Sequence, residues 1–295
     1  MTGTALRRAT VTTEDGEISY LEAGPSDAPV SVFVHGVFLN ALLWRNVIAS
    51  LPGRRCIAID LPAHGQTHIT AGHDLSLPAQ AELIERFCDA VGLGPVDMVA
   101  NDSGGAIAQV LAVRYPGRLR SLTLTNCDVH DNLPPPAFKP IVDLAAAGEL
   151  GPVAAQMLAD PDLARSEAGL GAGYEHPERL DDATVTAYLE PCVGTADAAR
   201  ELERFLNSLV AGDLVSIEPD LRRLDVPTLI VWGTGDVFFE TSWAYWLRDT
   251  IPGASEVVEI EGAKLFFPDE RAADLVPHLE RHWASVEALA QPRTA

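Results

Sequence analysis

The sequence predicts a mostly parallel, doubly wound α/β sheet with an inserted helical cap. Short, continuous runs of Val, Ile and Leu recur along the chain, and segments with helical spacing lie between them, which together predict the sheet. The alternation stops after Asn126 and resumes at Pro227, which predicts the insertion. We therefore expect a core domain over residues 1–127 and 226–295 and a helical cap over residues 128–225.

The individual elements follow from local patterns. Asp15-Gly16 tolerates positive φ at both turn positions, so the chain is expected to open with a β-hairpin. The later apolar runs are too continuous for a sheet with one wet face and are typical of buried parallel strands. These strands are predicted at 30–35, 56–61, 96–101, 119–126, 227–232 and 256–261, with helices at 42–50, 77–91, 103–115, 240–250 and from 269 onward.

Composition excludes several classes of function. Hydrophobic residues make up 47% of the 295 residues, which is ordinary for a globular protein and excludes an intrinsically disordered chain. The net charge of −21 repels phosphate backbones and anionic lipid, so neither nucleic acid nor a membrane is expected as a partner. The four cysteines form no CxxC pair and no zinc-ligand spacing, so no metal site is predicted. We expect a cytoplasmic monomer or homodimer that acts on a small molecule without a cofactor.

Polar residues follow four of the predicted strands. An open parallel sheet places its reactive groups beyond the carboxyl ends of its strands, so these residues are expected to face one pocket under the cap. The four strand ends are His35-Gly36-Val37-Phe38, Ala100-Asn101-Asp102-Ser103-Gly104-Gly105, Asn126-Cys127-Asp128-Val129-His130, and Gly233-Thr234-Gly235-Asp236.

The second of these strand ends has the pattern of a sharp strand-to-helix turn with Asp102 at its apex. Such a turn demands small residues two positions before and two after the apex, and Ala100 and Gly104 occupy those positions. With Ser103 at the apex, Asn101 would fall in the crowded place, so the aspartate is the better candidate nucleophile. The start of the helix would also stabilise its negative charge. The simpler interpretation is that Asp102 only caps the helix.

At these residues the chain resembles the α/β-hydrolase superfamily, and within it the branch with an aspartate nucleophile, the haloalkane dehalogenases and epoxide hydrolases. The resemblance rests on His35-Gly36, on Asp60-Leu61-Pro62-Ala63-His64-Gly65, on the Asp102 turn and on Gly233 through Asp236, together with residues 43–48. It implies that the backbone amides of Val37 and Ser103 form an oxyanion hole and that Asp236 orients a histidine base.

The histidine of the resembled family is missing from its expected place. It should follow the last strand, where this chain has Lys264 and Leu265, and Leu265 falls at the position of the base. Without a base, hydrolysis of an alkyl-aspartate ester should stall. His130 lies after the sixth strand beside Asp128 and Asp131, and we name it as the candidate replacement, although an exposed loop histidine would have the same pattern.

The pocket is expected to be largely apolar. His35 and Phe38 belong to the loop after the third strand, and Phe238 and Leu265 follow later strand ends where the resembled family lines its pocket. Tyr174 and Tyr188 are the cap tyrosines that could protonate an epoxide oxygen, although Tyr188 has helical spacing typical of packing. The remaining expected pocket residues are Asp128 and Lys264.

Three functions remain open at this point. The first is an epoxide-hydrolase-like enzyme with Asp102 as nucleophile and altered base machinery, which is preferred to a dehalogenase because the halide-binding residues of the resembled enzymes are missing. The second is a lyase, isomerase or cyclase that uses Asp102 and Asp236 as an acid/base pair, since two carboxylates in a poorly hydrated pocket cannot both ionise easily. The third is a catalytically silent binding protein.

Overall fold

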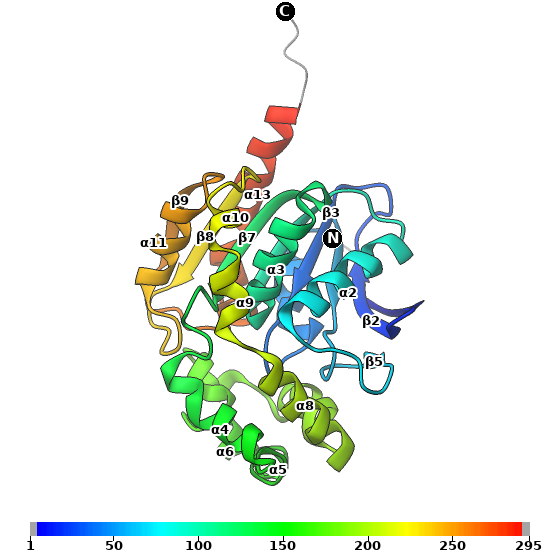
Figure 1. Cartoon of the computed structure of the whole chain (residues 1–295), viewed down its shortest axis with the longest axis vertical. Coiled ribbons are helices and arrows are strands. Elements are labelled where there is room, and N and C mark those ends of the chain that lie inside the picture. The colour runs from blue at the N-terminus through cyan, green and yellow to red at the C-terminus, as the bar shows by residue number, and fades with distance from the viewer. Residues whose placement is uncertain (1–4, 291–295) are drawn as a thin grey trace, which may run out of the picture.

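The computed structural model describes residues 5–290 and shows a sheet-containing core with a helical cap at one end (Figure 1). The helices α4, α5, α6 and α8 gather in the cap, at the bottom of the view, while the sheet and its covering helices lie above them. This arrangement confirms the predicted α/β class.

The sheet has the order β1-β2-β4-β3-β6-β7-β8-β9, and the short β5 pairs with β2. The opening hairpin is antiparallel, as predicted, with Thr13 paired to Gly16, and β2 is also antiparallel to β4. From β4 through β9 all neighbouring strands are parallel. The strands are β1 (Arg7–Thr13), β2 (Gly16–Ala23), β3 (Val30–Val34), β4 (Arg55–Ile59), β5 (His68–Ile69), β6 (Val96–Asp102), β7 (Leu119–Cys127), β8 (Thr228–Gly233) and β9 (Ala254–Ile260).

Helices cover both faces of the sheet. In Figure 1, α2 and α3 lie in front of the strands, and α13, which packs against α1, passes behind them. The core helices are η1 (Ala41–Trp44), α1 (Arg45–Ala49), α2 (Leu77–Ala90), α3 (Ser103–Arg114), η2 (Pro116–Arg118), α11 (Thr241–Thr250), α12 (Phe267–Glu270) and α13 (Ala272–Ala290).

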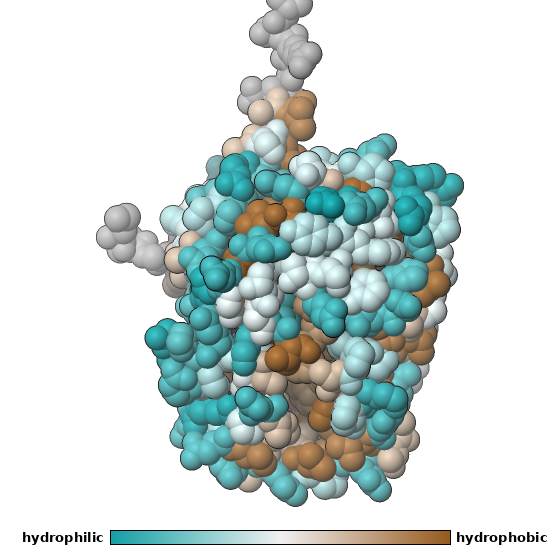
Figure 2. All heavy atoms as spheres, turned by 90° about the vertical axis from the view of Figure 1, so that its left-hand side faces the viewer, coloured by the Kyte–Doolittle hydropathy of each residue, from teal (hydrophilic) through white to brown (hydrophobic). Residues whose placement is uncertain are grey.

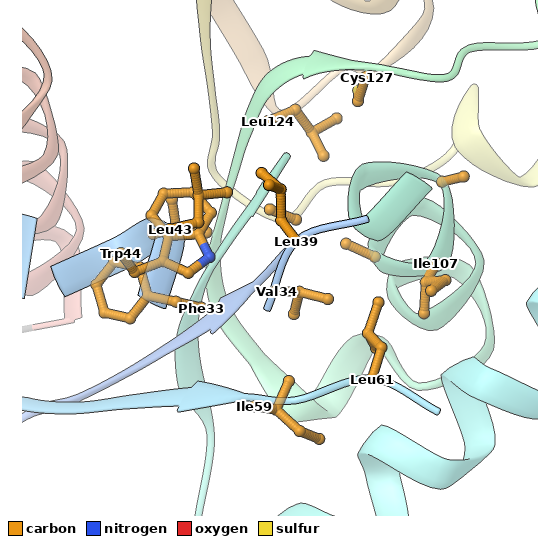
Figure 3. Close-up of a cluster of buried hydrophobic side chains, with 14 of the residues drawn as sticks. Phe33, Val34, Leu39, Leu43, Trp44, Ile59, Leu61, Ile107, Leu124 and Cys127 are labelled. Atoms are coloured by element: carbon orange, nitrogen blue, oxygen red, sulfur yellow. The ribbon is translucent and has the colours of Figure 1, made fainter. Parts of the chain in front are cut away.

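The two faces of β3 show how the strands are buried. Phe33 and Val34 are neighbours on β3, and side chains alternate along a strand, so they point to opposite faces of the sheet (Figure 3). Phe33 packs against Trp44, with 5.2 Å between ring centroids, and Val34 lies on the side of Ile107 of α3. All four side chains have no exposed surface. The buried strands therefore hold the loops at their carboxyl ends in fixed positions.

The regular elements between β7 and β8 are all helices. They are η3 (Pro136–Phe138), α4 (Lys139–Ala147), α5 (Leu150–Ala159), α6 (Pro161–Arg165), η4 (Leu170–Gly173), η5 (Pro177–Arg179), α7 (Asp182–Val193), α8 (Ala196–Ser208), α9 (Ala211–Ser216) and α10 (Glu218–Leu221). The last two helices pack against α3 of the core rather than against the cap helices. Within the described residues, no single helix is long and apolar enough to cross a bilayer, and the 136–147 and 150–159 helices reach that length only as a pair bent by 115°.

Candidate active site

Asp102 lies at the apex of a strained turn between β6 and α3. Its φ of 58° and ψ of −136° are unfavourable for a residue with a side chain, and such strain is concentrated at functional sites. The turn is crowded as the sequence predicts, because a β-carbon on Gly104 would overlap with the carbonyl oxygen of His35. A β-carbon on Gly105 would likewise overlap with the Cys127 side chain.

The Asp102 carboxyl accepts hydrogen bonds from backbone amides. The Val37 amide donates to Oδ2 at 3.0 Å, and the Ser103 amide also stabilises the charged form. Among the described residues no side chain donates to this carboxyl, and Asp102 lines the cavity between core and cap. Burial raises the pKa of Asp102 to about 7, against the opposing effect of the two amides. Backbone amides therefore hold the carboxyl at the wall of the cavity.

A cavity of about 330 Å³ lies between the core and the cap, and Asp102 is part of its wall. Its wall is mostly apolar, and the cap contributes residues such as Ile141, Met157 and Leu189. The ionisable side chains on the described wall are Asp102, Asp128 and Glu167, and none of them is basic. Figure 2 shows apolar residues gathered around a hollow in the lower half of the molecule, where the cap meets the core.

Asp128 is the second carboxyl buried in the cavity wall. It follows Cys127, the residue of β7 that pairs in register with Asp102 of β6, so the fold places the two aspartates on adjacent strand ends. Its side chain is 2% exposed, and Oδ1 has no hydrogen-bond partner among the described residues. Burial, reinforced by the nearby charge of Asp102, raises the pKa of Asp128 well above its usual range. Asp128 therefore keeps its proton to a higher pH than an ordinary aspartate does.

Asp236 is held behind the cavity wall rather than in it. Asn126 donates to its Oδ2 at 2.7 Å, and the Phe238 amide donates to its Oδ1 at 2.8 Å. Burial raises the pKa of Asp236 to about 6 despite these donors, and its charge in turn raises the pKa of Asp102. Asp236 is coupled to Asp102 as expected, but it is not one of the residues that line the cavity.

Leu265 occupies the cavity wall after β9. It is 4% exposed. Its carbonyl accepts a hydrogen bond at 3.0 Å from the side chain of Asn101, the residue before Asp102. Val37, Phe38 and Phe238 also line the cavity, as predicted. Within the described residues, the wall contains no His, Lys, Arg, Tyr, Trp or Asn side chain. No imidazole therefore faces Asp102 across the cavity.

The structure does not support the predicted catalytic role of His130. Its Nε2 lies 3.0 Å from Glu218 and its Nδ1 lies 3.2 Å from Asp131, while the ring stacks on Trp246, 5.0 Å away between centroids. These contacts hold the ring outside the cavity wall, with one-fifth of the side chain exposed. The backbone at residue 130, with φ at 52°, turns the ring toward these partners.

Two other predicted pocket residues also lie outside the wall. His35 is fully buried next to the loop of residues 36–38, where its Nε2 accepts from the Leu61 amide and its Nδ1 donates to the Gly36 carbonyl. Burial lowers the pKa of His35 to about 4, so it is a neutral structural residue. Lys264 acts on Asp236, whose pKa its charge lowers, but it does not line the cavity.

Tyr174 and Tyr188, predicted as possible proton donors, point to Asp269 instead. Each hydroxyl donates to Asp269 Oδ2 at 3.2 Å, and Arg45 Nη2 lies 3.1 Å from the same oxygen. Burial raises the pKa of both tyrosines. Neither residue lines the cavity, so the prediction that they face substrate is wrong. They tie the cap to α12 of the core.

Two residues that organise the site were given no role from the sequence, although Asn126 belongs to one of the four strand ends expected to face the pocket. Asn126 holds Asp236 and also accepts from the Gly233 amide at 2.6 Å. Asp269 gathers the two tyrosines and Arg45 at the boundary between cap and core. The position of Asn126 at the end of β7 was a usable signal, because polar residues at strand ends of a parallel sheet face the site. Asp269 had no comparable signal.

Comparison with known proteins identifies the family. The model of the alpha/beta hydrolase fold family matches residues 29–271. The chain belongs to this family. This α/β hydrolase is 27% identical over 284 residues to haloalkane dehalogenase 2 of Mycobacterium tuberculosis, a match that covers 88% of this chain and 91% of that enzyme. It is also 25% identical over 278 residues to the cis-3-alkyl-4-alkyloxetan-2-one decarboxylase of Xanthomonas campestris pv. campestris, covering 88% and 90% of the two chains.

Solved structures resemble this α/β hydrolase over almost its whole length. A haloalkane dehalogenase loop variant from Bradyrhizobium elkanii has a TM-score of 0.78 at 21% identity and covers 97% of this chain and 99% of its own. The 2-hydroxy-6-oxo-6-phenylhexa-2,4-dienoate hydrolase from Rhodococcus sp. strain RHA1 has a TM-score of 0.80 at 21% identity, covering 95% and 99%. At these identities the likeness shows the fold.

Proposed function

We propose that this α/β hydrolase opens a strained oxygen ring, an epoxide in the first instance, in a small and largely apolar molecule, with Asp102 as the nucleophile. The observation that carries the proposal is the placement of the Asp102 carboxyl. The Val37 amide holds Oδ2, no side chain of the described residues donates to the carboxyl, and Asp102 lines a mostly apolar cavity. A carboxylate held in this way is aimed at an electrophilic carbon.

The amides that hold Asp102 also suit the second half of such a reaction. After Oδ1 has formed an ester, attack of water on Cγ places negative charge on Oδ2. The Val37 and Ser103 amides already act on the carboxyl, so the developing charge meets preorganised donors. The strained backbone at Asp102 fixes this orientation before substrate arrives.

The charges of the cavity favour ring opening over release of an anion. The ionisable groups of the described wall are all carboxyls, and the wall has no indole or amide side chain to bind a halide. A leaving halide or carboxylate would therefore be repelled and left unsolvated. When an oxygen ring opens, the leaving oxygen stays attached to the molecule and takes up a proton, so no free anion has to be stabilised.

The relatives support a strained or electrophilic substrate. One relative is named a haloalkane dehalogenase and another an alkyloxetan-2-one decarboxylase. An oxetan-2-one is, like an epoxide, a strained oxygen ring with alkyl substituents. The cavity volume of about 330 Å³ is in the range of sites for small organic molecules.

A panel of aliphatic epoxides and alkyl bromides of matched chain length tests this proposal. We expect diol from at least one epoxide, no sustained bromide release, and loss of diol formation in Asp102→Asn. Asp131→Asn is the matched control, because Asp131 is an exposed carboxyl near the site whose partner is His130. Steady bromide release without diol would instead identify a dehalogenase, and ligand binding without turnover would identify a binding protein.

A second candidate is a non-hydrolytic lyase or isomerase. The observation that favours it is the pair of carboxyls in one cavity, Asp102 with a pKa of about 7 and Asp128 with a pKa raised well above its usual range by burial, which together would form an acid/base pair. Here the structure offers Asp128, rather than the expected Asp236, as the second member of the pair. Conversion of a β-lactone or epoxide to a product that contains no oxygen from water would favour this function over hydrolysis.

A further inference from the structure

We propose that Asp128 replaces the absent imidazole, first as the acid that protonates the opening ring and then as the base that activates water. The inference rests on the proposed function, because it assigns a second group to the same reaction. It gives a catalytic role to a carboxyl that the sequence indicated only as a pocket residue.

The position of Asp128 carries the argument. It lies directly after Cys127, which pairs with Asp102 across β6 and β7, and both aspartates line the same cavity. Gln109 donates to the Asp128 backbone carbonyl at 2.8 Å, which fixes the main chain at this point. A buried polar atom without a partner is costly, yet Asp128 Oδ1 has none among the described residues. The carboxyl of Asp128 therefore keeps hydrogen-bonding capacity that no described residue uses, in a residue that lines the cavity.

Burial and charge both favour the protonated form of Asp128. Burial raises its pKa well above the usual range of an aspartate, and the negative charge of Asp102 adds to this effect. The adjacent Cys127 thiol also has a pKa raised by burial, so it supplies no competing charge. Asp102, with a pKa of about 7, ionises around neutral pH, while Asp128 resists ionisation in the same cavity.

The other groups that could donate this proton are turned away from the cavity. Tyr174 and Tyr188 donate to Asp269, and His130 is engaged by Glu218 and Asp131. The only other ionisable side chain on the described wall, Glu167, is exposed to solvent. Asp128 is the buried acid that remains.

The two carboxyls alone can donate and take up every proton that the reaction cycle requires. Asp102 Oδ1 forms a bond to a ring carbon, the carbon–oxygen bond of the ring breaks, and the released oxygen takes the proton of Asp128. Asp102 is now a neutral ester and Asp128 a carboxylate. Asp128 then removes a proton from water as the hydroxide adds to Cγ of Asp102, and returns that proton to the alcohol as the ester bond breaks. The proton left on Asp102 passes to Asp128, which restores both groups.

The experiment compares two electrophiles in Asp128→Asn, an aliphatic epoxide and an alkyl iodide of the same chain length. Iodide leaves without a proton, so only the epoxide needs the acid. Intact mass in a single turnover measures the rate at which Asp102 is alkylated. We expect this rate to fall by about 100-fold or more with the epoxide and to change little with the iodide. Asp131→Asn should behave like the unmodified protein with both.

The unmodified protein provides a second measurement that does not depend on folding of the variant. Alkylation by both electrophiles should increase as Asp102 ionises through about pH 7. At higher pH only the epoxide reaction should slow, because Asp128 then loses its proton. Equal slowing with both electrophiles in Asp128→Asn, or an epoxide rate that is unaffected, would overturn the role of Asp128 while leaving Asp102 as nucleophile. Absence of alkylation by either electrophile in the unmodified protein would overturn the proposed function itself.

Discussion

Gly36 and Asp102 fit together so closely that a β-carbon on Gly36 would overlap with Cβ, Cγ and Oδ2 of Asp102. The loop of residues 36–38 and the β6 turn therefore fit together as one unit. The absence of a side chain at Gly36 lets the Val37 amide reach the carboxylate.

Gly36→Ala tests this fit. The added methyl group must displace the Asp102 carboxyl or the loop, so we expect turnover to fall by about 100-fold or more, as for other small misplacements at reacting groups. Gly53→Ala is the matched control, because nothing lies within 4 Å of a β-carbon at that glycine. Activity and stability of both variants are measured side by side. A Gly36→Ala variant that turns over like Gly53→Ala would contradict the geometry.

Asp102→Asn is predicted to stabilise the fold at alkaline pH. The folded-state pKa of Asp102 is raised from 3.8 to about 7, so its contribution to stability is fully present below the lower value and is lost as pH rises through the higher one. Asn cannot ionise, and the variant should therefore gain up to about 4 kcal/mol in unfolding free energy over the unmodified protein above that range. Chemical denaturation at about pH 5 and about pH 9 measures the difference. An equal difference at both pH values would show that Asp102 has an ordinary pKa.

Tyr174→Phe and Tyr188→Phe separate anchoring from catalysis. Each variant removes one hydrogen bond to Asp269, so the unfolding free energy should fall by about 1 kcal/mol while epoxide turnover changes little. Thermal denaturation and diol formation are followed in parallel. If either variant lost about 100-fold in ring opening at unchanged stability, that tyrosine would be the proton donor after all.

Leu265→His places an imidazole where the resembled enzymes have their base. Leu265 lines the cavity, and its carbonyl is held by Asn101, so the backbone at this position should stay in place. We expect a cooperative fold and faster breakdown of the Asp102 ester, with ring opening unchanged. Leu265→Gln controls for polarity without a base. Similar ester lifetimes in the two variants, or a large loss of thermal stability in the histidine variant, would show that Leu265 is misplaced.

The sequence predicted the framework of this molecule because the relevant signals are local. Apolar runs such as Val96–Asn101 are interpretable without knowledge of their partners, and the small residues around Asp102 predicted the turn. Parallel strands then bring their carboxyl ends together, which correctly placed Val37, Phe38, Asp128, Phe238 and Leu265 around one cavity.

The directions of the side chains could not be predicted in the same way. Tyr174 and His130 are close in sequence to residues that line the cavity. Their side chains nevertheless point to hydrogen-bond partners that are distant in sequence, Asp269 and Glu218. The packing of α9 and α10 on α3, rather than on the cap, likewise depends on tertiary contacts. The sequence predicted that Asp236 would affect the ionisation of Asp102, and the charge of Asp236 does raise the pKa of Asp102. It did not predict that Asn126 would hold Asp236 away from the cavity wall.

The most direct test of Asp102 as nucleophile is a single turnover in water labelled with heavy oxygen, with excess protein over an epoxide that is converted. Hydrolysis of an Asp102 ester at Cγ must leave one labelled oxygen in the carboxyl, so the account predicts label in the peptide that contains Asp102 and none in the first diol formed. Label in that first diol, with an unlabelled Asp102 peptide, would show that water attacks the substrate directly and would contradict the account.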